Sequence, residues 1–117
     1  MQYLLLLHAD EAEWDQMAPE DQQAAVAAYA AFTQALKDSG RWVASARLQL
    51  AETAQTVRTK GGRTVVMDGP FAETKEQLGG FYLIEAESPE VAAEWAARCP
   101  GAGHGVVEVR PLWTPGA

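Results

Sequence analysis

The central stretch of the sequence is Asp68-Gly69-Pro70-Phe71-Ala72-Glu73-Thr74-Lys75-Glu76-Gln77-Leu78-Gly79-Gly80. The apolar run 64–67 leads into it and the apolar run 81–84 leads out of it. Asp-Gly-Pro is turn chemistry, because Asp can hydrogen-bond its own backbone, Gly accepts a positive φ and Pro fixes φ. The connection is longer than the roughly two to five residues of an ordinary hairpin. A long, charged connection between two strands is a candidate functional loop, and a solvated loop is the alternative interpretation.

The hydrophobic pattern outside this stretch predicts an alternation of strands and helices. A stripe at 25, 29, 32 and 36 indicates a helix over 19–39 that packs on a sheet, and Ser88-Pro89 is a helix start that ends at Pro100. Gly61-Gly62 favours a tight hairpin turn. We expect strands at 2–7, 42–46, 56–59, 63–67, 81–84 and 106–110, a helical turn at 10–17, a flexible link at 101–105 and a flexible tail at 113–117.

This order of elements predicts an α+β fold, namely a ferredoxin-like βαββαβ unit with an extra β-hairpin. We expect a single domain over residues 1–117. Two helices can cover only one face of the sheet, yet the strands 3–7 and 81–84 are apolar at consecutive positions. Soluble monomers rarely expose so large an apolar face. We therefore expect a homodimer that packs sheet to sheet, with a cavity near or between the sheets.

Composition narrows the functional classes. Nine basic residues against 16 acidic ones give a net charge of −7, which argues against a direct nucleic-acid partner. The first helical region is strongly acidic and the middle strands are basic. No apolar run reaches membrane-spanning length, so no membrane partner is expected. The one cysteine, Cys99, cannot form an internal disulfide, which favours a reducing, cytoplasmic location.

The motif from Asp68 to Glu76, followed by Leu78-Gly79-Gly80-Phe81-Tyr82, resembles the signature of the DGPF group of YCII-related proteins. The opening Tyr3–Leu7 and the closing Glu108–Leu112 resemble the same group, so the likeness covers nearly the whole chain. The resemblance implies a dimeric α/β barrel of ferredoxin-like subunits. Some YCII-related proteins are similar to a dehydrochlorinase and are thought to use a His–Asp pair. The histidine of that pair lies on the first long helix, and residues 19–39 of this chain contain no histidine.

We expect Asp68 and His104 to be the catalytic candidates. A carboxyl at a strand end beside an apolar ring can act as acid or base, and a histidine in a glycine-rich loop is accessible for proton transfer. A turn cap and a structural histidine are the alternative interpretations. Arg110, on an alternating strand, is expected to meet Asp68 or Glu76 unless it points outward. The candidate ligand-binding residues are His8, Phe71, Glu73, Lys75, Glu76 and Arg110.

Two functional hypotheses from different classes follow. The first is binding of a small molecule in the barrel cavity, with cofactor-free acid–base chemistry such as elimination or isomerisation. We expect no metal and no cofactor, because the two histidines have no fixed ligand spacing and no phosphate-binding or nucleophile motif is present. The second follows from the family resemblance: a non-enzymatic accessory protein in extracytoplasmic-function sigma-factor regulation, with a sigma factor as partner.

Overall fold

The consecutive apolar residues of β1 (Gln2–Ala9) place this strand inside a sheet, between two neighbours. In the computed structural model, which describes residues 1–114, the sheet has four antiparallel strands in the order β2-β5-β1-β6. The other three strands are β2 (Trp42–Arg47), β5 (Gln77–Glu85) and β6 (Val106–Pro111). This is the predicted ferredoxin-like α+β fold. The predicted flexible tail extends into 115–117, which lie outside the described residues.

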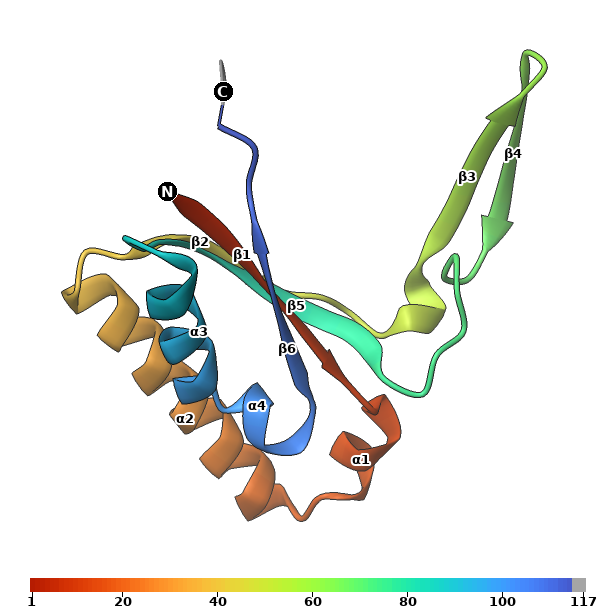
Figure 1. Cartoon of the computed structure of the whole chain (residues 1–117). Coiled ribbons are helices and arrows are strands. Elements are labelled where there is room, and N and C mark those ends of the chain that lie inside the picture. The colour runs from red at the N-terminus through yellow and green to blue at the C-terminus, as the bar shows by residue number, and fades with distance from the viewer. Residues whose placement is uncertain (115–117) are drawn as a thin grey trace.

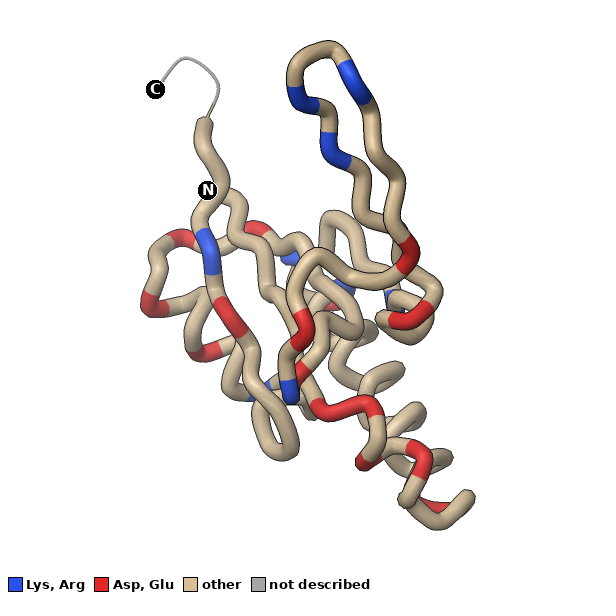
Figure 2. The backbone as a smooth tube through the Cα atoms, turned by 90° about the vertical axis from the view of Figure 1, so that its right-hand side faces the viewer, with Lys and Arg blue, Asp and Glu red and all other residues tan. Residues whose placement is uncertain are grey.

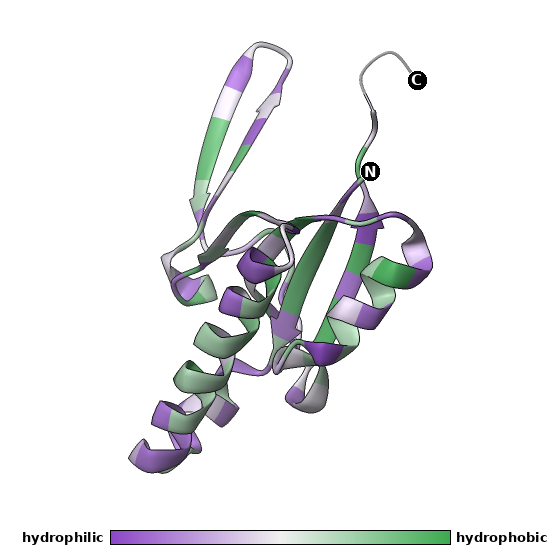
Figure 3. Cartoon of the chain, turned by 90° about the vertical axis from the view of Figure 1, so that its left-hand side faces the viewer, coloured by the Kyte–Doolittle hydropathy of each residue, from purple (hydrophilic) through white to green (hydrophobic). Residues whose placement is uncertain are grey.

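Two helices pack on one face of this sheet (Figure 1). They are α2 (Pro19–Asp38) and α3 (Pro89–Arg98). The Ser88 hydroxyl accepts a hydrogen bond from Val91 N at 3.2 Å, which caps α3 as predicted. A shorter helix, α1 (Glu11–Gln16), is capped by the Asp10 side chain. Figure 3, viewed from the helix side, shows hydrophobic strand segments between the two helices.

The core lies between the helices and the sheet. Tyr3, Leu5 and Ile84 are fully buried on the strands, and Phe32 and Leu36 meet them from the predicted stripe of α2. Aromatic and polar contacts join the two layers. Phe32 packs edge-on against Tyr82 with the ring centroids 5.1 Å apart, and the Tyr82 hydroxyl lies 2.8 Å from Thr33 Oγ1.

The strands β3 (Gln55–Lys60) and β4 (Arg63–Asp68) form a separate two-stranded sheet. Gly61 and Gly62 have positive φ values of 59° and 77°, which the predicted tight turn requires. A short 3-10 turn, η1 (Ala51–Thr53), precedes the hairpin. In Figure 1 the hairpin stands clear of the body, on the side of the sheet away from α2 and α3. The radius of gyration is therefore 16.3 Å, against about 13 Å for a compact chain of this length.

One predicted loop is a helix in the structure. The link 101–105 was expected to be flexible, but Gly101–His104 forms the short helix α4. Gly101 is buried, and a Cβ there would lie 2.9 Å from the Tyr29 hydroxyl. Close packing against α2 and β1 orders this glycine-rich segment, and local composition does not report such tertiary packing.

The pair Gly79-Gly80 lies at a β-bulge. The β1–β5 register shifts between Leu7 and His8, which leaves Gly79 without an opposite residue. Gly80 also lies close to a neighbouring backbone, because a Cβ there would lie 2.8 Å from the Ala46 carbonyl oxygen of β2. The missing side chain therefore lets β2 and β5 pair.

We predict that Gly80→Ala lowers the free energy of unfolding by about 1–3 kcal/mol, because the clash is with backbone and forces the strands apart. Gly79→Ala is the matched control, since its Cβ would meet nothing closer than 3.9 Å. Urea unfolding followed by circular dichroism measures both variants. Equal losses in the two variants would contradict the close approach at Gly80.

We also predict a fall in stability at alkaline pH that depends on Tyr29. Burial, with the nearby Cys99 and Tyr82, raises the pKa of Tyr29 from 10.0 to about 12. The folded state then holds its proton more tightly than the unfolded state, so this contribution is complete below pH 10 and is lost as the pH rises toward 12. Urea unfolding across this range should show a smaller loss in Tyr29→Phe. Superimposable pH profiles for the two proteins would contradict the prediction.

Candidate functional site

Within residues 1–114, the sheet has a second face that no helix covers. Strand residues alternate between the two faces, so Leu4 and Leu6 of β1 point away from the core residues Tyr3 and Leu5. Leu83 lies opposite Leu4 in the ladder, and Phe81 lies opposite Leu6. These four apolar side chains belong to partly exposed residues. We use the name open face for the side of the four-stranded sheet that carries Leu4, Leu6, Phe81 and Leu83.

A polar trio lies on the β1–β6 side of the open face. Leu6 pairs with Glu108 and Leu4 pairs with Arg110, so both polar residues share the face of the two leucines. His8, two residues after Leu6, completes the trio. His8 Nε2 lies 3.7 Å from Glu108 Oε1, and Glu108 Oε2 accepts a hydrogen bond from Arg110 Nη2. The trio therefore runs His8–Glu108–Arg110 along one edge of an apolar surface.

The His8 imidazole has an unused polar atom. Nε2 is buried and has no hydrogen-bond partner within residues 1–114, because 3.7 Å is longer than a hydrogen bond. The His8 side chain as a whole is 29% exposed, although Nε2 itself is buried. A histidine ring nitrogen can accept a proton or bind a polar ligand atom.

Two members of this trio were predicted from the sequence, and the third was missed. His8 and Arg110 were candidate ligand-binding residues, but Arg110 pairs with Glu108, not with Asp68 or Glu76 as expected. The signal for Glu108 was present in the alternation of Val106 to Arg110, which puts 108 and 110 on the same face. The link to His8 depends on the β1–β6 register, which joins residues about 100 positions apart and has no local sequence signal.

The catalytic candidates Asp68 and His104 lie on different elements. Asp68 ends β4 opposite Gln55 at the base of the hairpin, and His104 ends α4. Both residues are exposed. Neither side chain forms a hydrogen bond or an ion pair with another part of the chain between residues 1 and 114. Asp68 and His104 therefore have no contact that joins them into a pair.

The loop between β4 and β5 is exposed. Phe71 is 79% exposed, and the Arg58 guanidinium lies over its ring, 5.8 Å from the centroid. Glu73, Lys75 and Glu76 are also exposed. The end of the loop is held by Gln77, whose Oε1 accepts a hydrogen bond from Glu11 N at 3.0 Å. Within residues 1–114, none of the predicted ligand-binding residues of this loop forms a hydrogen bond or an ion pair with His8, Glu108 or Arg110.

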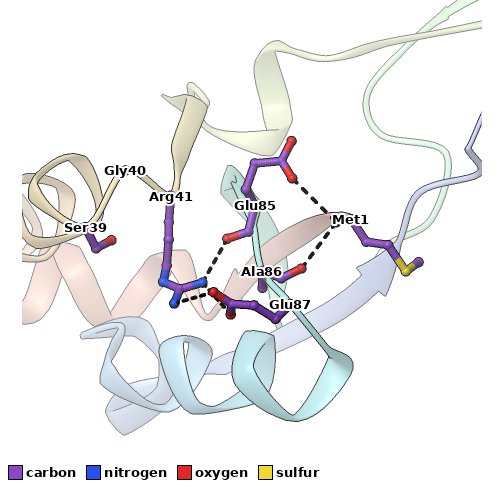
Figure 4. Close-up of a pocket in the computed structure, with 7 residues that line it drawn as sticks. All are labelled: Met1, Ser39, Gly40, Arg41, Glu85, Ala86 and Glu87. Carbon is purple, nitrogen blue, oxygen red and sulfur yellow. Dashed lines mark hydrogen bonds and ion pairs between the residues drawn. The ribbon is translucent and has the colours of Figure 1, made fainter.

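A pocket of about 290 Å³ lies beyond the Met1 end of β1 (Figure 4). The Arg41 guanidinium makes two hydrogen bonds to Glu87, at 2.9 and 3.0 Å, and this contact lowers the pKa of the Glu87 carboxyl. The amino group of Met1 lies 3.6 Å from Glu85. Because these charges already pair with one another, we interpret this pocket as structural.

The described part of the chain contains no candidate metal site and no candidate membrane-spanning helix. Over residues 1–114, no three His, Cys, Asp or Glu residues are grouped so that they could hold a metal ion. None of the helices in the same range combines the length and apolar character that a membrane span needs.

The fold and the open face define a class of protein, the ferredoxin-like α+β domains with one uncovered sheet face. The chain belongs to the YCII-related family, because the model of the YCII-related domain matches residues 1–114. It is 39% identical over 114 residues to an uncharacterized protein of Rhizobium meliloti (strain 1021), covering 96% of this chain and 92% of that protein.

A solved structure shares the fold. It is the 5-chloro-2-hydroxyhydroquinone dehydrochlorinase TftG from Burkholderia phenoliruptrix AC1100, in complex with 2,5-dihydroxybenzoquinone. The TM-score is 0.56 at 18% sequence identity, and the match covers 99% of this chain and 96% of that one. At this identity the likeness supports the fold, and the roles of individual residues must be argued from this chain.

Proposed function

We propose that the protein binds a small hydroxylated aromatic or quinone-like molecule on its open face, and that His8 is the acid–base group there. The observation that carries this proposal is the buried, unpartnered Nε2 of His8 beside the Glu108 carboxylate. Leaving a buried polar atom without a partner costs about 1–3 kcal/mol. A ligand hydroxyl that hydrogen-bonds Nε2 would remove this cost.

The apolar part of the open face suits a flat ring. Leu6, Phe81 and Leu83 offer hydrophobic contact, while His8 and Arg110 at the edge can bind oxygen atoms. This is the usual composition of a ligand site, in which a few polar groups orient a molecule on an apolar surface. TftG, which shares the fold, is a dehydrochlorinase of a chlorinated hydroquinone and holds dihydroxybenzoquinone in its solved complex. That chemistry supports the same ligand class for the open face.

The proposed site needs a second copy of the chain to enclose it. The open face alone is a surface, and a second sheet stacked on it, at the usual spacing of about 10 Å, would leave an enclosed apolar space. We propose that the protein is a homodimer in which two open faces meet. Exclusion of water would strengthen the polar contacts of His8 and Arg110 with the ligand.

If the protein is an enzyme, the trio supports a cofactor-free elimination or isomerisation. In an elimination, His8 Nε2 would take a proton from the substrate, the electrons of that bond would form a new double bond, and the leaving group would depart with its bonding electrons. Glu108 would stabilise the imidazolium. Asp68 and His104 remain predicted alternatives for the base, and variants of both can be compared with a variant of His8.

The second hypothesis, an accessory role beside a sigma factor, stays a prediction. Neither the fold nor the comparisons bear on such a partner. The cytoplasmic location also stays a prediction.

We predict that isothermal titration calorimetry with 2,5-dihydroxybenzoquinone will show binding to the wild-type protein. His8→Phe keeps a flat ring but removes both nitrogens, so it should weaken binding about tenfold, the effect of losing one strong hydrogen bond. His104→Phe and Asp68→Ala, whose side chains form no hydrogen bond or ion pair with the trio, should bind within about twofold of wild type.

Three outcomes would contradict this assignment. Unchanged binding by His8→Phe would remove His8 from the site. A tenfold loss in His104→Phe or Asp68→Ala would move the base to that residue. Absence of binding to wild type at millimolar ligand would refute the proposed ligand class.

A further inference from the structure

We call the β3–β4 hairpin, residues 55–68, the arm. No element among residues 1–114 packs along its length. Apart from Thr56, which is partly buried, its strand residues are exposed. Hydrogen bonds between its two ends close the base of the hairpin: Gly69 N donates to Ala54 O at 2.7 Å, and Thr56 Oγ1 donates to Gly69 O at 2.9 Å. An isolated two-stranded hairpin is only marginally stable in water, so the arm needs a covering surface.

Both faces of the arm carry exposed apolar side chains. Val57 and Val66 face each other across the ladder on one side and are 61% and 55% exposed. On the other side lie Val65 and Met67, at 53% and 63%. Figure 3 shows these strands as partly hydrophobic although they stand clear of the body. Exposed apolar side chains gathered on one small element favour an interaction site.

The charge of the arm indicates what covers it. Arg58, Lys60 and Arg63 are exposed on the arm, and no acidic residue occurs from 55 to 67. The chain as a whole is acidic, with a net charge of −7. Its densest acidic stretch is residues 10–21, which we call the acidic segment. Figure 2 shows basic residues on the arm, at the top, and acidic residues along the helices at the bottom. The acidic residues of the segment are Asp10, Glu11, Glu13, Asp15, Glu20 and Asp21.

We propose that the arm of one copy docks on the acidic segment of a second copy. In a two-fold dimer this contact occurs twice, because each chain supplies both the basic arm and the acidic surface. Six-residue strands make the arm about 20 Å long, whereas stacked sheets lie about 10 Å apart. An arm on the open-face side of its own sheet therefore extends past the sheet of a stacked partner, to the depth of the partner's helical layer.

The proposal rests on the proposed homodimer but assigns a different surface and a different role. The open face would hold the ligand, and the arm would determine the affinity and orientation of the two copies. Charge complementarity at an interface selects the partner and the orientation. Failure of the arm proposal can therefore be separated from failure of the proposed ligand site, because dimer affinity and ligand binding are measured independently.

The test is a charge swap read by sedimentation velocity. Lys60→Glu with Arg63→Glu reverses the tip of the arm and leaves the Arg58–Phe71 contact intact. We expect the dimer dissociation constant to rise about tenfold at roughly 0.05 M salt, where the Debye length is about 14 Å. At about 1 M salt the difference from wild type should disappear, because screening then acts within about 3 Å.

A second pair of changes identifies the docking surface. Glu13→Lys and Asp15→Lys, both exposed on α1, are added to the variant with the reversed arm. They should restore the dimer dissociation constant of the wild-type protein. Glu90→Lys with Glu94→Lys on α3 is the matched control, because it makes the same charge change outside the acidic segment and should not restore it. Asp10 and Glu11 are left unchanged, since Asp10 caps α1 and Glu11 accepts a hydrogen bond from Ala51 N.

Several results would overturn the proposal. These are a monomeric wild-type protein, an unchanged dissociation constant after reversal of the arm, and equal rescue by the α1 and α3 pairs. Tight binding of a short DNA duplex that the arm reversal abolishes, with dimer affinity unchanged, would assign the arm to nucleic acid instead. Loss of ligand binding with the charge-swap results intact would overturn the proposed function alone.

Discussion

The structure depends on an imbalance between its two layers: the two central strands, β1 and β5, are apolar on both faces, and α2 and α3 cover only one of these faces. Tyr3 and Leu5 are fully buried because α2 and α3 cover them. Leu4 and Leu6, next to them in the chain, belong to the same strand and have no such cover. A strand whose every second side chain lacks a partner inside the chain is stable in water only if something else removes that apolar surface from solvent.

The same imbalance positions the chemistry. His8, Glu108 and Arg110 lie on the uncovered face because β1 and β6 alternate in phase across their ladder. The bulge at Gly79 shifts the register next to His8, so β5 approaches this end of β1 through glycines. The His8 Nε2 atom has no hydrogen-bond partner within residues 1–114 and lies next to a carboxylate and an apolar surface. One copy of the chain therefore supplies only one side of the proposed ligand site. The arm rises on that same side of the sheet (Figure 1).

Most of the fold was predictable from local signals. Ser88 and Pro89 start a helix by their own side chains, Gly61-Gly62 form a turn by their backbone freedom, and the stripe of α2 follows from helical periodicity. The site was less predictable, because it depends on strand register. The sequence prediction placed the catalytic and binding residues mostly at Asp68 and in the loop that follows, where charged and turn-forming residues are concentrated. The trio instead brings together residues from opposite ends of the chain. Nothing near His8 in the sequence indicates Glu108 as its neighbour.

The central claim is that a second copy covers the open face, and an isotope-filtered nuclear Overhauser experiment tests it most directly. Protein labelled with ¹³C on leucine methyl groups is mixed with unlabelled protein and allowed to exchange. A dimer closed over the open face predicts intermolecular signals from the methyls of Leu4, Leu6 and Leu83 to protons of the unlabelled copy. A dimer that shows such signals only from leucines elsewhere, or a sample that shows none, would contradict it.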